Sequence, residues 1–381
     1  MFKTPSKAFQ QKINKFDVVK ILVIFLILSL GIYQRYRLLD ESGGDLPVIR
    51  RAVTDILDKK NPYEITVGTF RKDKPYVGTG SGLDHGYAYM PTLLYIYTPL
   101  YLIHQHFHIP LQRIWKSVTI LAELAVSAYF IKKLYNNDFD ILVATLIVWL
   151  FNPYIMARNS YTYTDPIGIF FMLIALDKLG KSDIKAGVYF ALSVSFKAFP
   201  LILLPLFLYK ARKKLKFIAS GFMTAFIIGI PFMNSMRDFS MFFKGSFLVH
   251  SDREVQGRPF IGSVVYLLKL KVYTSLSTKV LIYIATFSGW IYTIISYLRK
   301  KEINIYHVSL TCFTLFFVFT PVFTRTYILW LIPIYMLSIY QRFKSKKVYF
   351  YIFLSIFYIF FYVYLRAWDQ GFTLTNGLLT I

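Results

Sequence analysis

The chain has 381 residues, of which 56% are hydrophobic and 19% aromatic. Apolar runs long enough to cross a bilayer recur along it, which excludes a soluble globular enzyme and predicts a polytopic helical membrane protein. The net charge of +24 lies in short Lys and Arg clusters between these runs; this is the positive-inside pattern of cytoplasmic loops, not a nucleic-acid-binding surface.

The repeated apolar runs leave no room for a separate soluble domain. At bilayer depth every backbone polar group must be bonded within its own helix. We therefore predict one all-α bundle over residues 1–381, with about ten or eleven transmembrane helices. The lysine-rich N-terminus should be cytoplasmic, and the span after it lacks a small-residue cleavage motif, so it should be an uncleaved first helix.

The first span is predicted over residues 18–38 and leads to the outer side. A long polar stretch follows over residues 40–89 and begins a first outer loop predicted to reach residue 110, with surface helices. It holds eight of the 20 acidic residues, namely Asp40, Glu41, Asp45, Asp55, Asp58, Glu64, Asp73 and Asp84. Extracytoplasmic function should concentrate there.

One amphipathic helix is predicted inside this loop. Its apolar face carries Ile49, Ala52, Val53, Ile56 and Leu57, which follow helical spacing. Asn61 and Pro62 should end it, because proline cannot continue a helix. We expect this helix to lie on the outer membrane surface.

The next apolar segment, residues 87–107, either spans the membrane or lies along its surface. A span would place Lys132 and Lys133 outside, so the surface arrangement is favoured. Spans over 111–131, 141–157 and 166–179 then follow.

Residues 186–209 are apolar with basic clusters at both ends, which predicts two short helices meeting near Lys197 to Pro200. A second polar outer loop covers residues 234–260. The remaining spans are predicted at 217–233, 277–298, 303–319, 327–340 and 348–365.

Asp45 is the leading candidate for chemistry in the first loop. It follows two glycines immediately outside the first span, where a substrate could approach closely. The alternative is that Asp45 is the N-cap of the amphipathic helix, where its carboxylate would accept hydrogen bonds from the free backbone N–H groups of the first turn. Asp40 competes for the same role but lacks the glycine context.

The other candidates are charges in apolar or outer segments. Lys197 lies in an apolar run, where an ammonium requires a partner; a phosphate would suit it, and snorkelling to the interface is the alternative. Arg158, Arg258 and Arg325 fall on the outer side against the positive-inside trend, which favours either an anionic ligand or ion pairs with loop acids. Asp165 precedes Pro166 and is either a helix cap or part of the same site.

The sequence indicates no metal site. His104, His106 and His108 alternate without nearby acids or cysteines at metal-ligand spacing, so interfacial histidines are favoured over zinc ligands.

Four stretches in order resemble the polyprenyl-phosphate-sugar-dependent glycosyltransferases of the GT-C superfamily. They are "GGDLPVIRRAVTDILDKKNPYE" with "YAYMPTLLYIYTPL", "NPYIMARNSYTYTDPIGIFF", "SVSFKAFPLILLP" and "TPVFTRTYILWLIPIY". The nearest branches are the bacterial and archaeal polyprenyl-phosphate-mannose mannosyltransferases and GPI mannosyltransferase I. The GPI branch has a two-acid motif where this chain has "GGDLP", and the bacterial branch has a late histidine where this chain has "TRTY".

The resemblance implies a GT-C-type bundle and an inverting transferase. Asp45 matches the family's general base, and Lys197 with the three arginines would stabilise the departing phosphate. Arg325 or Tyr327 would take the place of the late histidine, and Asp165 is a candidate at the same donor site.

The implied partners are a polyprenyl-phosphate sugar, with mannose expected, a glycolipid or glycan acceptor, and the bilayer. A divalent cation requirement is left open. The expected location is the cell membrane with an extracytoplasmic site, or alternatively the endoplasmic reticulum membrane. A lipid or polysaccharide transporter is the main alternative, although the chain shows no internal repeat of the transporter kind.

Overall fold

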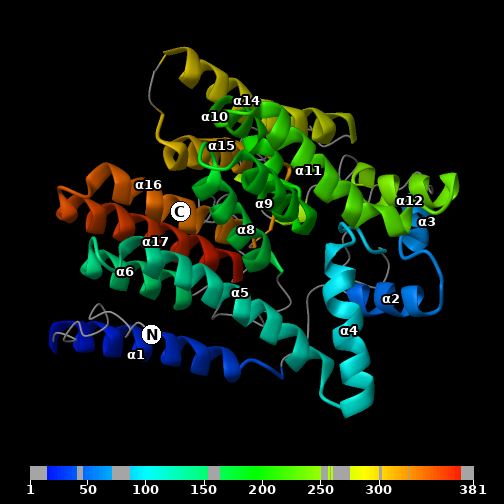
Figure 1. Ribbon diagram of the computed structural model, residues 1–381, viewed down its shortest axis with the longest axis horizontal. Helices are drawn as coiled ribbons and strands as arrows, with labels where there is room; N and C mark the ends of the chain where they lie inside the picture. The colour runs from blue at the N-terminus through cyan, green and yellow to red at the C-terminus, as the bar shows by residue number, and fades with distance from the viewer. Residues whose placement is uncertain are drawn as a thin grey trace, which may run out of the picture.

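The structure, a computed structural model, describes residues 15–40, 46–70, 86–152, 164–249, 256–257, 259–260, 275–299, 303–324 and 326–369. It is a bundle of α-helices, as predicted (Figure 1). The first half contains α1 (Lys15–Tyr36), α2 (Leu46–Leu57), α3 (Glu64–Phe70), α4 (Thr92–Phe107), α5 (Leu111–Leu134), α6 (Phe139–Leu150), α8 (Asp165–Lys178) and α9 (Asp183–Phe196). The second half contains η2 (Phe199–Leu203), α10 (Leu204–Lys210), α11 (Lys214–Gly229), η3 (Ile230–Phe232), α12 (Met236–Ser246), β1 (Gln256–Gly257), α14 (Ser275–Arg299), α15 (Ile305–Phe319), β2 (Val322–Phe323), α16 (Tyr327–Phe343) and α17 (Lys347–Asp369).

Among the described residues, four helical segments are long and apolar enough to cross a membrane. They are Asp17–Tyr36, Leu111–Leu134, Lys214–Phe232 and Val280–Arg299, and shorter apolar helices accompany them. This confirms an all-α, polytopic membrane protein. Each predicted span that the structure describes corresponds to a helix at nearly the same residues.

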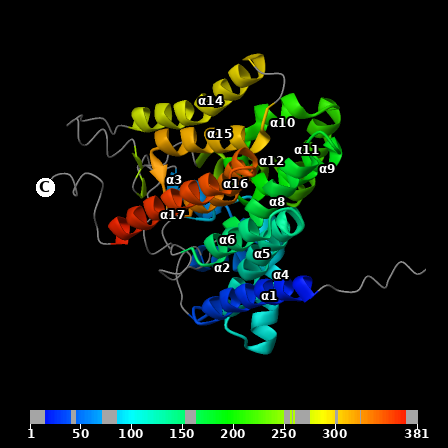
Figure 2. The same ribbon diagram turned by 90° about the vertical axis from the view of Figure 1, so that its left-hand side faces the viewer.

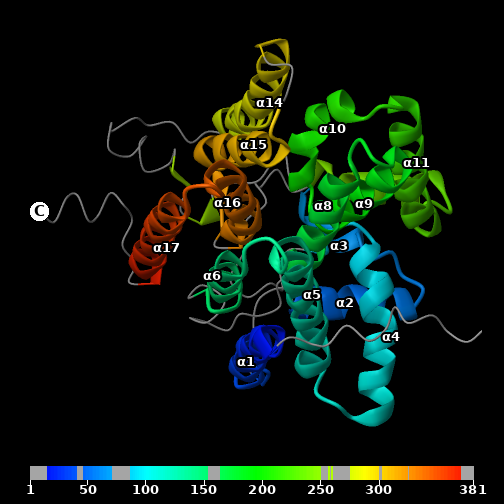
Figure 3. The same cartoon turned by 60° about the vertical axis from the view of Figure 1, so that its left-hand side comes forward.

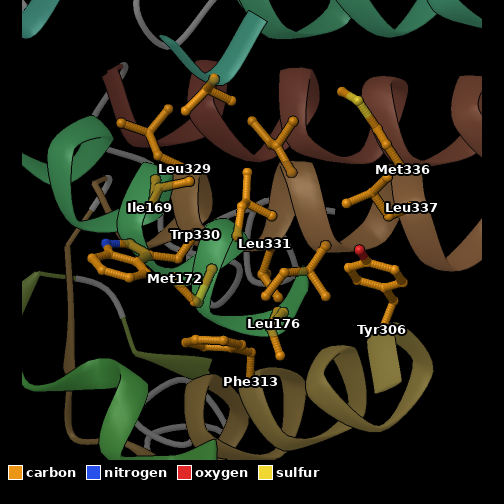
Figure 4. Close-up of a cluster of buried hydrophobic side chains, with 14 of the residues drawn as sticks. Ile169, Met172, Leu176, Tyr306, Phe313, Leu329, Trp330, Leu331, Met336 and Leu337 are labelled. Atoms are coloured by element: carbon orange, nitrogen blue, oxygen red, sulfur yellow. The ribbon is translucent and has the colours of Figure 1, made fainter. Parts of the chain in front are cut away.

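The helices pack in a stack that two turned views show clearly. From α14 the order runs through α15, α16, α6 and α1, and each neighbouring pair is in contact (Figures 2 and 3). A second group, α8, α9 and α11, packs beside it, with α5 against α8. Large apolar side chains fill the centre, where Met172 of α8, Phe313 of α15 and Trp330 of α16 are all fully buried (Figure 4).

The two predicted outer loops meet at one end of the bundle. Figure 1 shows α2, α3, α4 and α12 together there, with α4 running crosswise to α1 and α5. A second hydrophobic cluster joins α2, α4 and α5 with Tyr63, Tyr87 and Phe242. The described helices of the two predicted outer loops therefore lie together at one end of the bundle.

The amphipathic helix of the first loop is confirmed as α2. Its apolar residues Leu46, Val48, Ile49, Ala52 and Val53 are buried. The helix ends at Leu57, before the predicted stop at Asn61, and Lys59 takes a left-handed conformation with φ of 59°. A single residue of this kind is a common helix terminator.

The predicted break in the 186–209 segment is also confirmed. α9 ends at Phe196, and Lys197 is fully extended with φ of −161° and ψ of 137°. The chain then enters η2 with Pro200 in its first turn. Pro200 cannot donate a hydrogen bond to the carbonyl of Phe196, and its ring would clash with that carbonyl in a continuous helix, so α9 ends and a new helix begins.

Candidate functional site

Lys197 lies at the break between α9 and η2 and contacts two other parts of the chain. Its Nζ is 2.7 Å from Oδ1 of Asp165, the first residue of α8. It is also 3.2 Å from Oγ1 of Thr326, just before α16. The extended backbone at the break lets the side chain leave the helix axis and reach both. Three segments distant in sequence thus converge on one ammonium group.

Asp165 is a partner of Lys197 and not a helix cap. Thr164 occupies the N-cap position of α8, which has no side-chain cap hydrogen bond. The Asp165 carboxylate instead also accepts a hydrogen bond from Nε1 of Trp330 at 2.6 Å. Its side chain is only 4% exposed. The capping interpretation is therefore wrong: this is a buried carboxylate held by one cation and one indole.

Aromatic rings line the other side of the ammonium. The Lys197 Nζ lies 5.0 Å from the ring centroid of Tyr327 and 5.2 Å from that of Phe199, within the range of cation–π attraction. These two rings meet edge to face with centroids 4.3 Å apart. The Lys197 side chain is 21% exposed. The Lys197 ammonium is therefore bound by partners within the protein and does not extend to the membrane interface. Part of its side chain stays accessible.

Close packing fixes Trp330 against α8. A Cβ added to Gly168 would lie 2.8 Å from Cη2 of Trp330, so a glycine is required for this approach. The ring centroid of Phe313, on α15, lies 6.3 Å from that of Trp330, and Figure 4 shows Phe313 beneath the indole near Met172. The indole N–H is thereby aimed at Asp165.

A short parallel sheet is formed by the two chain segments that precede Arg258 and Arg325. Gln256 pairs with Val322 and Gly257 with Phe323. The pairing brings together the backbone segments that lead to Arg258 and Arg325. Both arginines lie outside the described residues, as do Arg158 and Asp45.

The residues on either side of position 325, Thr324 and Thr326, are linked to Lys197 by hydrogen bonds. Thr324 and Thr326 share a hydrogen bond of 3.0 Å between their hydroxyls, and Thr326 contacts Lys197. Of the predicted site residues, the structure brings together Lys197, Asp165 and Tyr327.

A second polar group holds the end of α1, just upstream of Asp45. Arg35 is buried and forms an ion pair with Glu123 of α5, and its Nη1 donates to the carbonyl oxygens of Gly31 and Leu150 at 2.9 Å each. The Lys116 ammonium donates to the carbonyl of Leu38. One helix, α5, thus supplies two side chains that fix residues 35–38.

Asp40, the competing candidate base, is already paired. Arg113 of α5 holds both of its carboxylate oxygens, at 2.5 and 2.9 Å. This hydrogen-bonded guanidinium holds the pKa of Asp40 below its ordinary value. A carboxylate that is engaged and made less basic in this way is a weaker proton acceptor than a free one.

Sequence reasoning missed three of these partners. No sequence feature distinguishes Trp330 or Thr326 from similar residues in a chain this rich in apolar and aromatic side chains. Glu123 did carry one, because a lone carboxylate within an apolar span needs a partner.

The histidine group shows no metal-binding arrangement. His104 contacts the carbonyl of Ile109 through Nδ1 at 2.6 Å. Within the described part of the chain, no three His, Cys, Asp or Glu side chains are placed to hold a metal ion.

The family model of glycosyltransferase family 87 matches residues 87–321, more than half of the chain. The chain belongs to glycosyltransferase family 87. A comparison with curated proteins finds no match. The family segment includes Asp165 and Lys197, whereas Asp45 and Tyr327 lie outside it. Membership makes the protein a membrane glycosyltransferase and disfavours the transporter alternative.

Proposed function

We propose that this family 87 enzyme transfers mannose from a polyprenyl-phosphate donor to a hydroxyl group of a lipid-linked or surface glycan. The reaction would take place on the extracytoplasmic side of the cell membrane. The observation that carries the proposal is Lys197: a partly accessible ammonium at a helix break, inside an apolar bundle and inside the family segment. A lipid-linked phosphate is a ligand whose charge and location match it.

Asp45 would act as the general base. It would take the proton of the acceptor hydroxyl while that oxygen attacks the anomeric carbon of the donor sugar. The bond from the anomeric carbon to the phosphate oxygen breaks on the opposite face, and polyprenyl phosphate leaves with the bond electrons. One displacement of this kind inverts the configuration at the anomeric carbon.

Cations would stabilise the leaving phosphate. Lys197 would serve with Arg158, Arg258 and Arg325, because charge develops on the phosphate as the bond breaks. Tyr327 would border the same site through its ring beside Lys197.

Asp165 would hold Lys197 in position and would not touch the phosphate. It is a buried anion whose bonds to Lys197 and Trp330 use the oxygen that faces the ammonium. A carboxylate repels a phosphate at short range. We therefore change its expected role from a ligand of the donor to a positioning residue.

The decisive experiment reconstitutes the purified protein in lipid with radiolabelled polyprenyl-phosphate mannose and a membrane glycolipid extract. We expect labelled product with the wild type and a loss of about 100-fold or more for Asp45→Asn, as general-base catalysis requires. Lys197→Met should lower the rate by about 100- to 1,000-fold, the usual effect of removing one group that stabilises developing charge.

Matched controls come from the same elements. Asp58→Asn removes another first-loop acid, one that is 59% exposed and paired with Lys60, and Lys185→Met removes an exposed lysine of α9. Both should keep wild-type transfer. Transfer from a nucleotide sugar but not from the lipid phosphate would refute the proposed donor, and full activity of a monodisperse Asp45→Asn protein would refute the proposed base.

A further inference from the structure

Helix α12 has an apolar stripe that stays exposed in the described protein. Met236 is 82% exposed, Phe239 42% and Phe243 44%. Their spacing of three and four residues places them on one face of the helix. Phe239 and Phe243 also stack on each other with ring centroids 6.2 Å apart. The stripe is therefore continuous along the helix.

The opposite face of α12 is fixed to the first loop. A Cβ added to Gly245 would lie 2.8 Å from Cδ1 of Tyr63, so the helix approaches that ring closely. Asn61 donates to Asp238 at 2.9 Å, and at the edge of this face the Arg237 guanidinium lies 3.0 Å from the Glu64 carboxylate. These contacts set the rotation of α12 and hold the apolar stripe outward.

The stripe continues the surface of a membrane-spanning helix. The candidate span Lys214–Phe232 ends four residues before α12 begins, and few of its residues are buried in the protein. Phe222 is 70% exposed, Ile227 62% and Ile230 47%. Exposed apolar side chains on a span face acyl chains. Figure 1 shows α12 following α11 toward the end where α2 and α3 lie.

The length and charge of α12 fit the edge of the bilayer and not its centre. Eleven residues give about 16 Å of helix, half of the roughly 30 Å hydrocarbon core. Arg237 and Lys244 lie seven residues apart on one flank of the stripe. An apolar face bordered by basic residues is the pattern of a helix lying at the boundary of headgroups and acyl chains.

We infer that α12 lies in the bilayer interface, with Met236, Phe239 and Phe243 among the acyl chains. Because α12 is bonded to Asn61 and Glu64, this anchor also sets the height of the first-loop helices above the membrane. The inference does not depend on the proposed sugar donor, and its test does not measure transfer.

The test uses nitroxide labels on single cysteines. The background is Cys312→Ala, since the natural cysteine is buried. Labels are placed by Phe239→Cys and Phe243→Cys, with Phe222→Cys as the lipid-exposed control and Lys60→Cys as the water-exposed control. Each protein is reconstituted in vesicles of phosphatidylcholine and phosphatidylglycerol. Collision rates are then measured with oxygen, which concentrates in lipid, and with a water-soluble nickel chelate.

We expect positions 239 and 243 to resemble position 222, with oxygen collisions exceeding chelate collisions. A pattern like that of position 60 would place the stripe in water and overturn the inference. Low collision rates with both reagents would also overturn it, because they would show that protein, such as a second copy of the chain, covers the stripe.

Discussion

The pairing of Lys197 with Asp165 can be tested by a double-mutant cycle on stability. Lys197→Met removes the cation and leaves a carboxylate that is 4% exposed without its counter-ion. Breaking a buried ion pair from one side costs about 3–5 kcal/mol. Asp165→Asn should cost less, about 1–3 kcal/mol, because the amide oxygen can still accept from Trp330 and Lys197, at 21% exposed, can turn toward water.

The double variant, Lys197→Met with Asp165→Asn, removes both charges together. Its loss of stability should be smaller than the sum of the two single losses by about 0.5–3 kcal/mol, the range measured for directly interacting residues. The measurement is unfolding by sodium dodecyl sulfate in mixed micelles, followed by circular dichroism. Lys185→Met on the exposed side of α9 is the control and should change little.

The same cycle separates the two roles of Lys197. If the lysine also serves the donor phosphate, the losses of stability are less than additive in the double variant, while its transfer stays as low as that of Lys197→Met. Additive losses of stability, or a Lys197→Met protein as stable as the control, would refute the reasoning that a buried, coupled ion pair joins α8 and α9.

Three further predictions concern packing, the end of α1 and pH. Gly168→Ala should cost about 1–3 kcal/mol by overpacking against Trp330, measured by the same unfolding assay. Arg35→Lys should cost about 1–3 kcal/mol, because a lysine cannot reproduce the forked contacts of the buried guanidinium, and it should also lower transfer. Asp238 accepts hydrogen bonds from Asn61 and Ser235 that hold its pKa below the ordinary 3.8. The contact of α12 with Asn61, three residues before α3, should therefore persist above that pH and weaken only as the pH falls below it. Spin-label distances between α3 and α12 should therefore stay constant from about pH 8 to about pH 5.

Each of these has a matched comparison. Gly68→Ala adds a methyl group with no atom within 4 Å, so equal losses at positions 68 and 168 would contradict the packing explanation. Arg212→Lys changes an exposed arginine and should be neutral. An unchanged unfolding curve for Arg35→Lys would show that its contacts contribute little. A label distance that changes near neutral pH would show that another group controls the contact of α3 with α12.

Much of the fold could be predicted from residue patterns. Apolar runs and basic clusters located the spans, helical spacing located α2, and the charge at both ends of residues 186–209 located the break at Lys197. These features are local, and each depends on residues close together in the chain.

The partners of Lys197 could not be predicted in the same way. Asp165 is 32 residues away and Thr326 is 129 away, on helices whose contacts depend on packing in three dimensions. The rule that an ammonium in an apolar segment needs a partner was sound. The rule alone does not distinguish a phosphate from a distant carboxylate, because residue patterns do not show which segments pack together.

In the proposed mechanism, the ion pair holds a cation ready for a lipid-linked phosphate. An ammonium without a partner in an apolar bundle destabilises the protein. Asp165 supplies the missing charge, and Trp330 fixes the carboxylate so that the ammonium stays aimed at one place. The donor phosphate would then join an existing pair and accept the one ammonium hydrogen that Asp165 and Thr326 leave free. The transfer rate should therefore be more sensitive to Trp330→Phe than stability is, because the ring still fills the core while the carboxylate loses the bond that orients it.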